Sequence, residues 1–135
     1  MKQEFIGGLE VRRECVTHRV SALYHFHEWV ALEETWYREA KLHREDGPAK
    51  ISRDPATGAV MKEEWYREGK MHRDDGPAAI ARDAATGVVI LELWVSEDRM
   101  HREGGPASIK YDAATGAAIN EAWWLDGERQ EPPQP

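Results

Sequence analysis

The sequence predicts an all-β protein, built as one elongated single antiparallel sheet of stacked β-hairpin units. Tryptophan recurs every 29 residues, at Trp36, Trp65, Trp94 and Trp123, and His-Arg, Gly-Pro and Thr-Gly pairs keep the same interval. A fixed period of this size is typical of repeat proteins, in which each unit buries its apolar face against its neighbours. The Gly-Pro and Thr-Gly pairs also leave no segment long enough for a stable helix. We expect these units to fill residues 32–127, and we number them in chain order, so that the second unit is the one that contains Trp65.

The segment before the first unit is expected to be a degenerate N-terminal cap, residues 1–31. It carries neither the His-Arg-x-Asp-Gly-Pro pattern nor Thr-Gly. Residues 18–34 alternate as one long strand would, with Val20 and Tyr24 on one side. Terminal units are commonly atypical because they cover an otherwise open sheet edge.

Each unit reads as a hairpin when it is followed along the chain. In the second unit, residues 59–67 alternate and are rich in strand formers, and residues 68–70 supply a tight turn through glycine. Gly76-Pro77 must interrupt regular pairing, and residues 78–82 form a short second strand. Asp-Ala-Ala-Thr-Gly closes the hairpin, and the next unit then extends the same sheet. After the last unit, the proline-rich tail 128–135 is predicted to be disordered or polyproline-like.

Strand alternation decides which side chains share a face. Each tryptophan lies on the face of the glutamate two residues earlier, and an isoleucine from the second strand is expected to pack on the indole. A carboxylate beside an indole is costly unless it is paired, so Arg44, Arg73 or a backbone amide of the adjacent unit should be its partner. The glutamates are Glu34, Glu63, Glu92 and Glu121, and the isoleucines are Ile51, Ile80 and Ile109.

The string 65–78, in which aromatic residues and a Gly-Lys turn precede Asp-Gly-Pro-Ala, resembles the bacterial branch of the MORN (membrane occupation and recognition nexus) repeats. The resemblance covers residues 32–127. It implies hairpin repeats in an elongated sheet and a non-catalytic, protein-interacting role, and some members of this branch are labelled antitoxins. The chain departs from the family in its longer unit, in Asp98-Arg99 at the Gly-Lys position and in Gly104-Gly105 at the Asp-Gly position.

Regularly spaced aromatic residues and arginines favour a protein-binding function, because these side chains are enriched at interface hot spots. We expect an adaptor or antitoxin-like module that binds a protein partner through its aromatic sheet face or edge, needs no cofactor and can pair with a second copy of itself. The predicted partner-binding residues are Trp36, Trp65, Trp94, Tyr37, Tyr66, His43, Arg44, His72, Arg73, His101 and Arg102.

The His-Arg pairs have a second, structural interpretation. Histidine and arginine can brace the irregular loop by bonding its carbonyls and its aspartates, Asp46 and Asp75. Hairpins repeat at roughly 9–10 Å along a sheet, so histidines of successive units are too far apart to share one zinc ion. Four equivalent glutamates likewise fit a structural ladder better than one tuned active site, and we expect no enzymatic activity.

The charge balance restricts the class of partner. Eighteen Lys and Arg residues stand against 25 Asp and Glu, a net charge of −7, which argues against direct binding of nucleic acid or of an anionic membrane. An acidic inhibitor that mimics nucleic acid in a basic groove is the alternative function. Cys15 is the single cysteine, and residues 1–8 have no apolar leader, so a cytoplasmic protein is expected.

One cluster outside the units has the residue types of a metal site. Cys15 and His18 are followed by His25 and His27, a compact set that zinc could use if the two pairs folded toward each other. A small zinc-binding protein is therefore the least favoured alternative, and the leading expectation is no bound metal.

Overall fold

The computed structural model describes residues 5–13, 16–25 and 28–133. Within these ranges the chain is all-β and antiparallel, as predicted, and no helix is long and apolar enough to span a membrane. The strands are β1 (Phe5–Arg13), β2 (Val16–His25), β3 (Glu28–Arg38), β4 (Lys41–Leu42), β5 (Lys50–Arg53), β6 (Val60–Glu64), β7 (Tyr66–Arg67), β8 (Lys70–Met71), β9 (Ala79–Arg82), β10 (Val89–Leu93), β11 (Val95–Ser96), β12 (Arg99–Met100), β13 (Ser108–Tyr111), β14 (Ala118–Leu125) and β15 (Glu128–Gln130).

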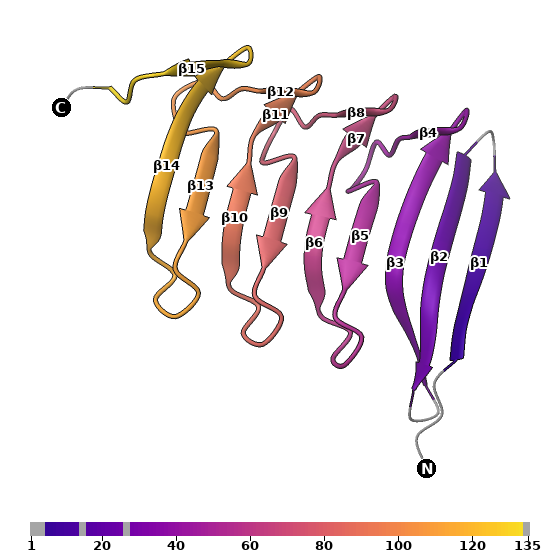
Figure 1. Cartoon of the computed structure of the whole chain (residues 1–135). Helices are drawn as coiled ribbons and strands as arrows, with labels where there is room; N and C mark the ends of the chain where they lie inside the picture. Colours follow the sequence, from indigo (N-terminus) through magenta and orange to yellow (C-terminus); the bar gives the residue numbers. More distant parts are fainter. Residues whose placement is uncertain (1–4, 14–15, 26–27, 134–135) are drawn as a thin grey trace.

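One large twisted sheet contains most of these strands, in the order β1-β2-β3-β5-β6-β9-β10-β13-β14-β15, with β4 attached to β3. Each strand pairs with its neighbour in an antiparallel register. In Figure 1 the Thr-Gly turns line one long side of the sheet, and the small hairpins line the other. The first and last strands therefore lie at opposite ends of a sheet one layer thick.

The tryptophan of the second and third units interrupts the strand that was predicted to run through it. Residues 59–67 were expected to form one strand, but β6 ends at Glu64, and β7 pairs only with β8 in a separate two-stranded sheet. Trp65 N donates instead to Ala78 O at 2.7 Å. The tight turn that follows has positive φ at both central residues, 51° at Glu68 and 83° at Gly69, as a type I′ hairpin requires.

Both terminal segments differ from their predictions. Residues 18–34 do not form one long strand, because β2 and β3 are antiparallel neighbours in which His25 lies opposite Glu28. Alternation continues through both strands and so conceals the reversal between them. The predicted cap boundary at residue 31 falls inside β3, and the first three residues of the predicted tail form β15 against β14.

The buried apolar residues of the described chain are mostly small. Ala49, Ala78 and Ala107 have no exposed surface, and no large side chain is fully buried. The accessible surface is 8959 Å², whereas a globular monomer of 15.4 kDa has about 7,200 Å². A sheet of one layer therefore relies on local stacking, rather than on a deep core, to hold its loops.

Candidate functional site

An arginine guanidinium lies over the tryptophan ring of each complete unit. In the second unit the Arg73 guanidinium carbon is 3.9 Å from the centre of the Trp65 ring, well within the range of a cation–π contact. The same guanidinium donates to Pro77 O at 3.1 Å and to Asp75 Oδ1 at 3.1 Å. The tryptophan is therefore clamped by the loop that follows it. The equivalent stacks are Arg44 on Trp36 and Arg102 on Trp94, both at 3.8 Å.

The glycine of Gly-Pro is explained by this stack. A Cβ atom on Gly76 would lie 2.7 Å from the guanidinium carbon of Arg73, closer than real Cβ contacts allow. Gly47 and Gly105 meet Arg44 and Arg102 in the same way. Proline then supplies the carbonyl that accepts from the arginine. The arginine, glycine and proline of the His-Arg-x-x-Gly-Pro string thus pack together as one local structure.

The histidine beside each arginine joins its unit to the next one. His43 Nδ1 accepts from the backbone N of Glu68 at 2.9 Å, and Glu68 lies in the turn of the second unit. His72 repeats this bond with Glu97 N, and His101 repeats it with Asp126 N. An accepting Nδ1 places the proton of the neutral ring on Nε2, which in His72 lies 2.7 Å from Asp74 Oδ1.

The structural interpretation of the His-Arg pairs is therefore confirmed in part. Arg44 and Arg73 bond Asp46 and Asp75 and a loop carbonyl, as expected. The histidine, however, accepts from a backbone amide of the following unit. Main-chain bonds run beside it, from Arg44 N to Tyr66 O and from Gly69 N to Leu42 O.

Glutamate and isoleucine alternate across the tryptophan face of the sheet. Glu63 lies opposite Ile51 on one side and Ile80 on the other, and Glu92 lies opposite Ile80 and Ile109. The isoleucines therefore lie opposite glutamates in register, and the charged group over the rings of Trp36, Trp65 and Trp94 is a guanidinium. The same row continues from Glu34 opposite Ile51 to Glu121 opposite Ile109.

The predicted partners of these glutamates were wrong. Arg44 and Arg73 are engaged on the tryptophans, and three of the four carboxylates lie instead beside the side chain 19 residues later, on the neighbouring strand. Glu34 pairs with Arg53, Arg82 lies 3.9 Å from Glu63, and Tyr111 donates to Glu92 at 3.2 Å. His18 also lies 3.3 Å from Glu34 while stacking on Trp36 at 4.0 Å.

On the opposite face of the second unit, three polar side chains are joined by hydrogen bonds. The buried Glu64 bonds Lys62 at 2.8 Å and accepts from the Tyr66 hydroxyl at 3.2 Å. Burial, followed by the negative charge of Glu64, raises the pKa of Tyr66 to about 12. The hydroxyl is therefore a stable donor at neutral pH and is poorly suited to act as a base.

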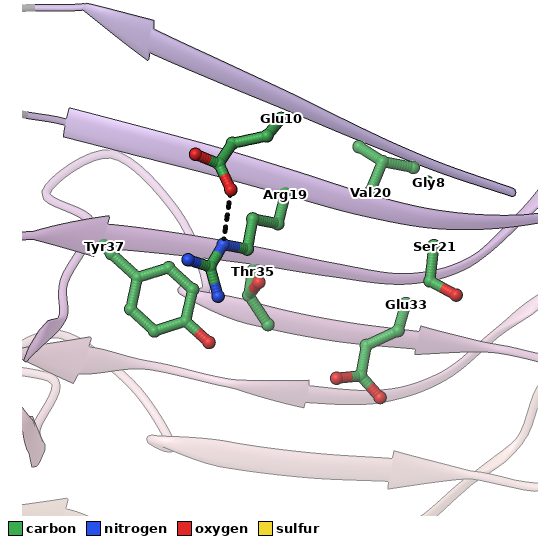
Figure 2. Close-up of a pocket in the computed structure, with 8 residues that line it drawn as sticks. All are labelled: Gly8, Glu10, Arg19, Val20, Ser21, Glu33, Thr35 and Tyr37. Atoms are coloured by element: carbon green, nitrogen blue, oxygen red, sulfur yellow. Dashed lines mark hydrogen bonds and ion pairs between the residues drawn. The ribbon is translucent and has the colours of Figure 1, made fainter. Parts of the chain in front are cut away.

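A polar hollow lies on this same face near the N-terminal end of the sheet (Figure 2). Its volume is about 460 Å³. Arg19 bonds Glu10 at 2.9 Å and lies 5.1 Å from the centre of the Tyr37 ring, so its charge is already engaged. The lining residues are Gly8, Glu10, Arg19, Val20, Ser21, Glu33, Thr35 and Tyr37. These groups suit contact with a polar surface better than nucleophilic chemistry.

The candidate zinc residues are only partly covered by the structure. Cys15 and His27 lie outside the described residues, as does the side chain of His25, whereas His18 stacks on Trp36. Within the described residues no group of three or more histidine, cysteine, aspartate or glutamate side chains is placed to hold a metal ion.

The predicted partner-binding residues fall into two groups. The tryptophans, arginines and histidines come together in the stacks and unit-to-unit bonds, and His43 and His72 are buried. Tyr37 and Tyr66 lie half-buried on the other face. Binding of a partner through any of them stays a prediction. The Glu–Ile row with its arginine partners is the surface that the sequence interpretation did not identify as a site.

Comparison with known proteins leaves the site to be judged on its geometry. No family model, no curated protein and no solved structure matches this chain.

Proposed function

We propose that this protein is a non-catalytic binding module of stacked hairpin units, similar in plan to the bacterial MORN-like repeats, which binds a protein partner through its tryptophan face or its sheet edge. The observation that carries the proposal is the single-layer sheet. Its surface exceeds that of a globular monomer by roughly 1,800 Å². A standard protein interface buries about 800 Å² on each partner, so the additional surface is large enough to hold one.

The chemistry of the tryptophan face supports the same function. Buried and half-buried isoleucines alternate with carboxylates that an arginine or a tyrosine accompanies, as at Ile80 beside Glu63 and Arg82. A partner can bury this apolar area, and the oriented charges fix the position in which it binds. The functional groups recur with the units. The Ser96 hydroxyl lies 3.4 Å from His72 Nδ1, but this nitrogen already accepts from Glu97 N at 3.1 Å and the ring is buried, so the contact suits a structural role better than nucleophilic chemistry.

Co-purification of the full chain from its native host, combined with two charge reversals on opposite faces, tests this function. Glu92→Lys alters the tryptophan face, and Lys110→Glu on the adjacent strand is the matched control on the other face. We expect a protein bound in stoichiometric amount that is retained with Lys110→Glu, while circular dichroism shows both variants folded. Loss of the partner with Glu92→Lys assigns it to the tryptophan face, and retention assigns it to the sheet edge. The absence of a stoichiometric protein partner would refute the proposal.

One observation favours the acidic-decoy alternative. The loops after the His-Arg pairs carry carboxylates along one side of the sheet, each with more than three quarters of its side chain exposed. They are Glu45, Asp46, Asp74, Asp75 and Glu103. A row of this kind can enter a basic groove. If the captured partner binds nucleic acid, competition by DNA separates the decoy, which DNA displaces, from the adaptor, which it does not.

A further inference from the structure

Every complete unit of the described chain has the same set of contacts between its first and second strands. At the second unit, Trp65 N donates to Ala78 O, Arg73 lies over the Trp65 ring, and Glu63 lies opposite Ile80. Trp36 and Trp94 repeat the first contact with Ala49 O and Ala107 O, at 2.8 and 2.7 Å. The segment that completes each tryptophan reads Arg-x-x-Gly-Pro-Ala-x-Ile.

The outer edge of β14 presents the first half of such a unit. Glu121 lies opposite Ile109 of β13, just as Glu92 lies opposite Ile80 of β9. On the outer side, β15 pairs only with residues 123–125. The described residues that follow β14, through Pro133, contain no Gly-Pro-Ala segment. Among the described residues, nothing takes the place of the next strand beside residues 120–122 (Figure 1).

The exposed groups at this edge are of the kind that a neighbouring strand covers. Ile119 is 66% exposed and Leu125 is 40% exposed, and both belong to β14. A hollow of about 520 Å³ lies against the same strand. It is lined by Glu121, Ala122, Trp123, Arg129, Gln130, Glu131 and Pro132. An open strand edge with unpaired backbone groups is a template for an added strand.

We propose that the outer edge of β14 is a docking site for an extended segment of another protein, which adds to the sheet antiparallel to β14. The inference rests on the proposed binding function and names its site and the chemistry of the partner. The segment supplies an arginine that stacks on Trp123 and a small residue whose carbonyl accepts from Trp123 N. An aliphatic side chain then lies opposite Glu121, and an arginine or tyrosine two residues later pairs with the Glu121 carboxylate.

The occupant is another protein rather than a second copy of this chain. The three segments of suitable sequence, which begin at Arg44, Arg73 and Arg102, are already paired within their own sheet. A second copy would have to open that sheet to supply one of them. The other end strand, β1, lacks the Gly-Pro-Ala pattern. Antiparallel addition of a separate segment is therefore the arrangement that reproduces the contacts of the complete units.

The chain itself provides the probe for this site. A synthetic peptide with the sequence of residues 72–82 contains every group named above, and its binding to the full chain is measured by calorimetry. We expect saturable binding at one site, weakened at least about tenfold when Arg73 of the peptide is changed to alanine, a loss of about 1.4 kcal/mol. Hydrogen exchange should show new protection confined to residues 119–123.

An exchange of charges between Glu121 and the peptide tests the register in which the peptide binds. Glu121 is exposed, so Glu121→Lys leaves the fold intact and should abolish binding of the peptide, because its Arg82 then meets a like charge. A peptide with Arg82→Glu should bind this variant again. Binding that is absent, or that ignores Glu121→Lys, overturns the proposal. A native partner that is lost with Glu92→Lys but retained with Glu121→Lys would uphold the general function and refute this site.

Discussion

The stacked guanidinium of the second unit gives the sharpest test of what holds the units together. Arg73→Met keeps the length and the apolar stem of the side chain and removes only the guanidinium. Four fifths of the Arg73 side chain is buried, so the cation–π contact with Trp65 is worth about 1 kcal/mol or more. The charged hydrogen bond to Pro77 O adds about 1.5–3 kcal/mol.

The ion pair with Asp75 adds little, because that carboxylate is 84% exposed and such pairs contribute about 0–1 kcal/mol. We therefore expect Arg73→Met to lower the free energy of unfolding by about 3 kcal/mol. With a urea slope of about 2 kcal/mol/M, the midpoint should fall by about 1.5 M. Tryptophan fluorescence and circular dichroism should report the same shift.

The matched control is Arg67→Met in the same unit. Arg67 is 48% exposed and reaches Asp74 only at 3.4 Å, so its loss should cost less than about 0.5 kcal/mol. Arg73→Lys keeps the charge and loses the planar group, and it should recover less than half of the difference. Equal midpoints for Arg73→Met and Arg67→Met, or full recovery with lysine, would refute the role assigned to the stack.

Three further predictions concern single residues. Ala40 has a φ of 64°, which favours glycine, so Ala40→Gly should raise the free energy of unfolding by about 1 kcal/mol; a lower urea midpoint would contradict this. Gly104→Ala meets no neighbouring atom and should cost only about 1 kcal/mol for its positive φ, whereas Gly105→Ala should destabilise more because its methyl group displaces the stacked guanidinium of Arg102; thermal melts that rank them in the reverse order would show that the stack yields easily. The raised pKa of Tyr66 means that the unfolded chain loses this proton first, so its contribution to stability is complete below about pH 10 and is lost as pH rises toward 12; tyrosinate absorbance should show this late titration, and Glu64→Gln should bring it earlier.

The sheet and its hairpins were predictable because local signals and the global fold agree. Alternating strand formers, glycine at the tight turns and Asp-Ala-Ala-Thr-Gly all indicate reversals at fixed places, and the antiparallel sheet follows from them. The break at Trp65 was not predictable from alternation, because Trp65 and Tyr66 alternate like their neighbours. It arises from the hydrogen bond between Trp65 N and Ala78 O and from the tight hairpin beyond it.

The contacts of the candidate site needed the register between strands. Glu34 pairs with Arg53 across two neighbouring strands. A separation of 19 residues predicts this contact only when the register between β3 and β5 is known. The competing prediction, Arg44, was reasonable by proximity in sequence. It failed because the Trp36 ring is a flat surface of matching size next to the same arginine, and a planar cation stacks there.

The bond from each histidine to the next turn means that the length of the sheet is set in steps of one unit. His43, His72 and His101 each reach one unit forward, so the described junctions depend only on immediate neighbours. Removing residues 58–86 would join Thr57 to Gly87 and recreate the same junction one step shorter. Each unit adds two strands, or roughly 9–10 Å across the sheet. The span of the sheet can thus change by whole units, because the loss or gain of one unit leaves the same kind of contact between the units that remain.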